Sequence, residues 1–157
     1  TGATGSTGPT GPAIILQPFV GANINPQSIP PGGNVTYASV TNANISYNGI
    51  DTFTINTNGI YVFLASLNFA PGQRINSTIG FFANNAIRFG DIGNADTVGN
   101  VVITSIGSFA AGNTIQIRNL NTDVPIDIIN GQANPSLTLT RTSGQLIIFK
   151  FADGPLP

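Results

Sequence analysis

Apolar and polar residues alternate along most of the chain after residue 13, in short runs. The clearest run covers residues 60–69, with Tyr61 and Phe63 on one face and Ile60 and Val62 on the other. A period of two residues is typical of a β-strand. Because both of its faces are apolar, we expect this strand to lie at the centre of a sheet and to be buried on both sides.

The same alternation predicts further strands separated by turn-forming residues. Pro and Gly break the pattern in a loop at 26–34, Asn84-Asn85 suits a tight hairpin turn, and residues 111–113 form another turn. No helical periodicity extends beyond about two turns, so about ten short strands predict an all-β sandwich or jelly roll. The other expected strands are residues 14–19, 35–41, 51–55, 78–83, 86–89, 98–109, 114–120, 136–140 and 145–151.

Residues 1–13 show a different pattern, in which glycine recurs at every third position. Their sequence is TGATGSTGPTGPA, with Gly2, Gly5, Gly8 and Gly11 in phase, and Ile14 ends the pattern. Only glycine fits at the axis of a collagen triple helix. We therefore expect the end of a collagen-like stalk at 1–13 and one globular domain at 14–157; a flexible Gly/Thr/Pro linker is the alternative.

The residues between these glycines favour a bacterial collagen. Proline follows glycine in the X position, whereas Thr4, Thr7 and Thr10 all occupy the Y position. Their hydroxyls would point outward from a triple helix and could carry sugars. Because the chain starts inside this repeat, we expect it to be a piece of a longer protein.

Composition narrows the choice of partners. Charged residues make up only 7% of the chain and hydrophobic residues 41%, whereas an ordinary domain has about 25% charged residues. The formal net charge is −1 with no basic cluster, which argues against nucleic acid. No apolar run is long enough to insert into a membrane. A surface with so few charges is suited to contacts between copies of the same chain that contain no ion pairs.

The residue inventory argues against an enzyme. The chain has no histidine and no cysteine, which removes Ser-His-Asp and Cys-His sites and nearly every zinc site. A Ser-Lys site would depend on Lys150 alone, in the last expected strand. We expect no catalytic residues and no cofactor.

Two pairs of aspartates are the only close carboxylates. Asp91 with Asp96, and Asp123 with Asp127, lie in stretches rich in Asn and Gly. Aspartates in such loops ordinarily bond nearby backbone, although the same residue types also bind calcium or, across a cleft, serve glycosidases. We keep these four residues as calcium candidates.

Residues 49–63, GIDTFTINTNGIYVF, resemble a known signature. Their G-x-Y-x-F ending is similar to that of the C1q/TNF superfamily, and D-T-F-x-I-x-x-x-G-x-Y is most similar to the C-terminal domains of collagen-like glycoproteins on bacterial spores, the BclA family. Three more segments match that pattern in order, at residues 77–85, 109–117 and 143–150.

The resemblance implies a C1q/TNF-like jelly roll of about ten antiparallel strands that assembles as a homotrimer. A trimer would hold three stalk chains in register. Tyr61, Phe63, Phe149 and Phe151 are the candidates for its interface. The alternative for each is an ordinary place in the core of one subunit.

These expectations favour a structural function and leave other functions as alternatives. The first is a trimerisation and capping domain of an extracellular filament, on a spore surface or exosporium or at the tip of an appendage. The second is a recognition module that mediates adhesion by binding other spore-surface proteins, host proteins or carbohydrate. A phage or viral fibre tip shares the same design.

Overall fold

The computed structural model describes residues 17–71, 77–87, 93–95, 99–130 and 143–154, and every regular element in them is a β-strand. The strands form two antiparallel sheets. The larger sheet contains β1 (Phe19–Ile24), β2 (Gln27–Ile29), β3 (Tyr37–Ala43), β6 (Gly59–Phe69), β10 (Gly99–Phe109), β12 (Ile126–Ile128) and β13 (Gly144–Ala152). The smaller sheet contains β4 (Ile45–Tyr47), β5 (Phe53–Ile55), β7 (Ser77–Ala83), β8 (Ala86–Ile87), β9 (Gly93–Ala95) and β11 (Thr114–Asn119).

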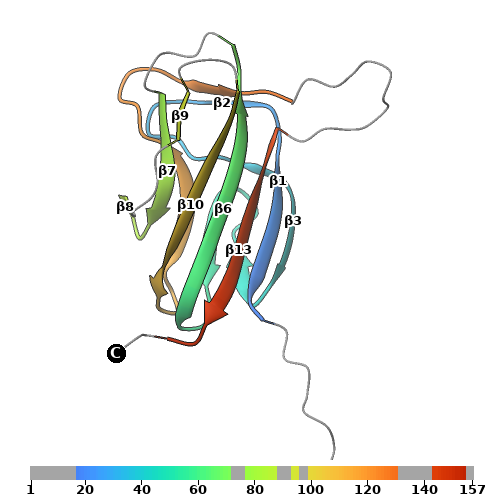
Figure 1. Cartoon of the computed structure of the whole chain (residues 1–157), viewed down its shortest axis with the longest axis vertical. Helices are drawn as coiled ribbons and strands as arrows, with labels where there is room; N and C mark the ends of the chain where they lie inside the picture. The colour runs from blue at the N-terminus through green and yellow to red at the C-terminus, as the bar shows by residue number, and fades with distance from the viewer. Residues whose placement is uncertain (1–16, 72–76, 88–92, 96–98, 131–142, 155–157) are drawn as a thin grey trace, which may run out of the picture.

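The long strand β6 organises the larger sheet. It pairs over its whole length with β10 on one side and from Ile60 to Leu67 with β13 on the other, and β1 and β3 follow beyond β13 (Figure 1). Phe19 at the start of β1 lies opposite Phe149 near the end of β13. The first and last strands of the domain therefore begin and end at the same end of the molecule, the lower end in Figure 1.

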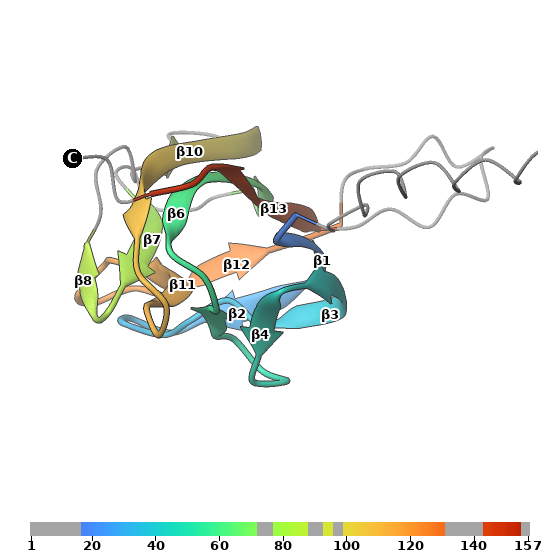
Figure 2. The ribbon, with the colours of Figure 1, turned by 90° about the horizontal axis from the view of Figure 1, so that it is seen from below.

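The core lies between the two sheets, whose edges surround it when the molecule is seen from below (Figure 2). The ring of Phe63 on β6 lies 5.6 Å from that of Phe81 on β7 and 5.0 Å from that of Phe109, between ring centroids. Tyr61 meets Phe109 edge to face. Burial of these aromatic side chains supplies much of the energy that holds the sheets together.

The predicted fold class is confirmed: the described chain is all β and its sheets are antiparallel. None of the described residues form a helix long and apolar enough to cross a membrane. The expected strands at 60–69, 98–109 and 145–151 are β6, β10 and β13 to within one residue at each end. The Asn84-Asn85 turn is also confirmed, because both residues have positive φ, 51° and 61°.

Other expectations differ from the structure. The loop expected at 26–34 contains β2, and β12 lies where no strand was expected; these two short strands pair with each other, Ile126 opposite Ile29. The first described strand runs from Phe19 to Ile24, beyond the range of 14–19. The stalk at 1–13 and the strand expected at 136–140 lie outside the described residues.

Candidate functional site

The two faces of β6 differ in burial. Tyr61, Phe63 and the alternate residues up to Phe69 are buried, whereas Ile60, Val62 and Leu64 on the other face are only partly buried. The expectation that β6 is buried on both sides is therefore wrong for the single chain. The second sheet covers one face of the larger sheet and leaves the opposite face open to solvent.

Strand register aligns apolar side chains in rows across this open face. Ile106 of β10, Val62 of β6, Phe149 of β13 and Phe19 of β1 are successive partners in one row. In the next row, Thr104 lies opposite Leu64 and Leu64 opposite Ile147. Side chains of a strand alternate between faces, so members of a row point to the same side.

The exposed large hydrophobic residues concentrate on the same face. Among the described residues six are exposed, and five of them lie on β10 or β13, pointing outward; the sixth, Ile50, lies in the loop after β4. Ile106 is 64% exposed and Phe151 68%. We call this surface the apolar face; it consists of Phe19, Ile60, Val62, Leu64, Val102, Ile106, Ile147, Phe149 and Phe151.

Uncharged polar side chains replace the apolar rows toward the other end of the sheet. Asn100 Nδ2 donates hydrogen bonds to Ser66 Oγ at 2.7 Å and to Asn68 Oδ1 at 3.0 Å. Asn23 Nδ2 donates to Ser39 Oγ at 3.0 Å. The outward face is thus apolar where β1 begins and polar but uncharged where it ends.

The four interface candidates from the sequence fall into two pairs. Phe149 and Phe151 lie on the apolar face, 36% and 68% exposed. Tyr61 and Phe63 are 0% and 1% exposed and pack between the sheets, so they offer no surface to another chain. They occupy the core of one subunit, which was the alternative to the interface. Ile106 and Ile147 also lie on the apolar face, but they could not be identified from the sequence, because alternation does not tell which side of a strand faces the second sheet.

Only two of the four calcium candidates lie among the described residues. Asp127 lies in β12 opposite Ser28, Asp123 lies in the segment before that strand, and Asp91 and Asp96 fall outside the described residues, as do Thr4, Thr7 and Thr10. Within the described ranges, no group of three or more acidic side chains could hold a metal ion. The calcium site stays a prediction from sequence.

No protein-family model and no curated protein matches the sequence. Solved structures do match the fold. Rabbit GITRL superposes with a TM-score of 0.56 at 12% identity over 87% of this chain and 96% of that one. Murine APRIL at pH 8.5 gives 0.55 at 11% identity, over 87% of this chain and 100% of that one.

Eiger TNF from S. frugiperda gives a TM-score of 0.56 at 12% identity over 90% of this chain and 98% of that one. At such identities the likeness concerns the fold. It agrees with the superfamily that the G-x-Y-x-F segment suggested, whereas the narrower resemblance to the BclA family stays a prediction. The chain thus has the two-sheet jelly-roll fold of the C1q/TNF-like superfamily.

Proposed function

We propose that this chain is the trimer-forming end domain of a collagen-like surface filament, and that the apolar face is its subunit interface. The observation that carries the proposal is the concentration of exposed aliphatic and aromatic side chains on one side of the larger sheet. A contiguous exposed apolar surface of this kind marks an interaction site in a folded protein. Interfaces between identical subunits are apolar and depleted in charge at their centre.

The glycine repeat supports three chains rather than two. A collagen helix needs three strands in register, and residues 1–13 carry its glycine period. β1 begins at the end of the domain where the apolar rows lie, since Phe19 is itself in such a row. Three domains joined through this face would bring their β1 strands together, where a stalk enters.

The proposal also includes the location of the domain on the cell and a structural, non-catalytic role. The resemblance of residues 49–63 to the BclA family supports the surface of a bacterial spore as the location. The residue inventory, without histidine or cysteine, supports a structural rather than a catalytic function. Labelling intact spores with an antibody against the domain tests the location.

Light scattering on a sizing column, repeated across dilution, tests the assembly. We expect a mass three times the 16.2 kDa of one chain. Ile106→Asp should give monomers, because a carboxylate would be buried in the interface without a partner. Ile50→Asp is the matched control, since Ile50 is 61% exposed and lies away from the larger sheet; its mass should not change.

Two results would contradict this assignment. A wild-type monomer at micromolar concentration would remove trimerisation as the function. A stable trimer of Ile106→Asp would show that the chains meet through another surface. Circular dichroism of both variants establishes that the β fold is intact, so that a change in mass reports the interface.

A further inference from the structure

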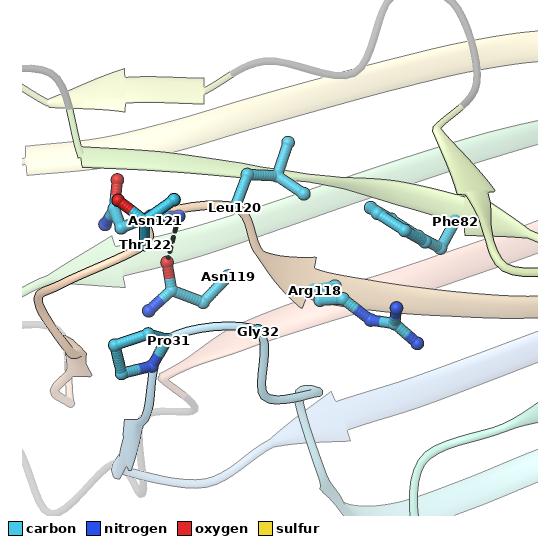
Figure 3. Close-up of a pocket in the computed structure, with 8 residues that line it drawn as sticks. All are labelled: Pro31, Gly32, Phe82, Arg118, Asn119, Leu120, Asn121 and Thr122. Atoms are coloured by element: carbon cyan, nitrogen blue, oxygen red, sulfur yellow. Dashed lines mark hydrogen bonds between the residues drawn. The ribbon is translucent and has the colours of Figure 1, made fainter.

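A pocket of about 480 Å³ lies on the opposite side of the molecule, against the outward face of the smaller sheet (Figure 3). Phe82 of β7 and Arg118 of β11 point outward there, since their neighbours Phe81 and Ile117 are buried. Pro31 and Gly32 form the facing wall. The pocket is shallow and largely open to solvent, so it would contact one side of a small ligand.

The walls of the pocket are fixed by one buried side chain. Asn119 is 0% exposed, and its Nδ2 donates hydrogen bonds to the carbonyl oxygens of Ile29, Pro30 and Val124, at 2.9, 3.2 and 3.1 Å. Its Oδ1 accepts from the backbone N–H of Asn121 at 2.9 Å (Figure 3). The loop before the pocket and the segment after β11 are therefore held in place before any ligand binds, which reduces the entropy lost on binding.

Arg118 is positioned by three neighbours. Its Nε donates to Asn34 Oδ1 at 2.9 Å, its Nη2 donates to Gln116 Oε1 at 2.7 Å, and its Cζ lies 4.3 Å from the centre of the Phe82 ring. A guanidinium has five N–H groups. The two bonds leave three of them without a partner among the described residues, including both on Nη1, and no described carboxylate forms an ion pair with Arg118.

The carboxylate of Asp51, which is close enough to Arg118 for their charges to interact, already accepts hydrogen bonds from neutral donors. Asp51 accepts hydrogen bonds from Asn34 Nδ2 at 2.7 Å, Thr52 Oγ1 at 2.7 Å and Asn48 Nδ2 at 3.0 Å. Partial burial raises the pKa of Asp51, but these bonds and the charge of Arg118 lower it by more, so it stays below its ordinary value. Asp51 therefore does not take up the free donors of Arg118.

Other lining groups offer a hydroxyl or apolar contact. Asn121 Nδ2 has no hydrogen-bond partner among the described residues, but the atom is buried, and Asn121 Oδ1 accepts from the backbone N–H of Thr78 at 3.0 Å, so this amide is not offered to a ligand. Thr122 is exposed and can bond a hydroxyl, whereas Pro31 and Leu120 present apolar surface. The lining thus combines one cation, uncharged hydrogen-bonding groups and small apolar surfaces.

We propose that this pocket binds a singly charged acidic sugar, such as a hexuronic acid unit, through its carboxylate. The carboxylate would accept hydrogen bonds from Arg118, which suits planar anions. A sugar hydroxyl would meet the exposed Thr122 hydroxyl, and the C–H face of the ring would lie against Pro31 or Leu120. A single arginine suits one negative charge better than the two of a phosphate monoester. This site is separate from the apolar face and does not depend on trimerisation.

Amide chemical shifts of the isotope-labelled protein, titrated with methyl glucuronide, test the site. We expect saturable shifts at residues 118–122 with a dissociation constant on the order of 1 mM, weakened by salt. Methyl glucoside, the neutral match, should cause none. Arg118→Gln should weaken binding about tenfold or more, since it removes a charged hydrogen-bond donor.

Two further variants separate binding from folding. Thr122→Trp fills the pocket from an exposed position, so it should abolish binding without lowering the melting temperature. Lys150→Gln, which removes a charge of the same sign at a distant site, should bind as the wild type does. The proposal is overturned if no shifts appear, if Thr122→Trp binds normally, or if inorganic sulfate binds as well as the glucuronide, which would leave only a simple anion site.

Discussion

The hydrogen bond of the Tyr61 hydroxyl offers a test of whether this residue belongs to the core of one subunit or to the interface. The hydroxyl donates a hydrogen bond of 2.8 Å to the carbonyl oxygen of Thr57 inside the subunit, and the ring is fully buried there. Tyr61→Phe should lower the free energy of unfolding by about 1 kcal/mol, because the Thr57 carbonyl loses a partner. Chemical denaturation at one fixed protein concentration measures the change.

A second tyrosine provides the control for this residue. Tyr47 also donates to a backbone carbonyl, that of Ile50, at 2.9 Å, but in an exposed setting where water can replace the bond. Tyr47→Phe should change stability by less than about 0.5 kcal/mol. The mass of Tyr61→Phe in solution should equal that of the wild type; dissociation of this variant would place Tyr61 at the interface after all.

Among the elements, β13 depends on a close approach to β6 at its first residue. A Cβ added at Gly144 would collide with the carbonyl oxygen of Ser66 and lie 3.2 Å from the Cα of Leu67. Because both atoms belong to the backbone of β6, they cannot move aside without breaking the pairing. Gly144→Ala should therefore lower the free energy of unfolding by about 2 kcal/mol; an unchanged melting temperature would contradict the register of Gly144 opposite Leu67.

The elements also show what the sequence could and could not predict. Long strands such as β6 and β10 were predictable, since alternation sustained over eleven residues rarely occurs outside a strand. The short strands β2 and β12 were not, because each exists only through its pairing with a segment about a hundred residues away in the chain.

The candidate interface was predictable only in part, for a similar reason. The apolar character of both faces of β6 is visible in the sequence, but which face the second sheet covers depends on long-range packing. Aromatic residues were therefore chosen as interface candidates on both faces, and only Phe149 and Phe151 proved to be on the open one. The pocket at Arg118 combines a loop, β7 and β11, which no local pattern brings together.

For the whole molecule, the scarcity of charge has a consequence for assembly. The apolar face and the polar rows beside it contain no charged side chain, so attraction between subunits would come from apolar burial and neutral hydrogen bonds. Salt screens charges but does not weaken apolar burial. The trimer should therefore keep its mass from about 0.05 M to about 1 M sodium chloride.

The two proposed sites of the molecule should differ in their response to salt, and one experiment can measure both. Binding of glucuronide at Arg118 depends on charge and should weaken over this salt range, while light scattering of the same samples shows a constant mass. The melting temperature should rise with protein concentration at both salt concentrations, since unfolding would be coupled to dissociation. A trimer that dissociates at high salt would instead indicate that the subunits meet through charged groups outside the apolar face.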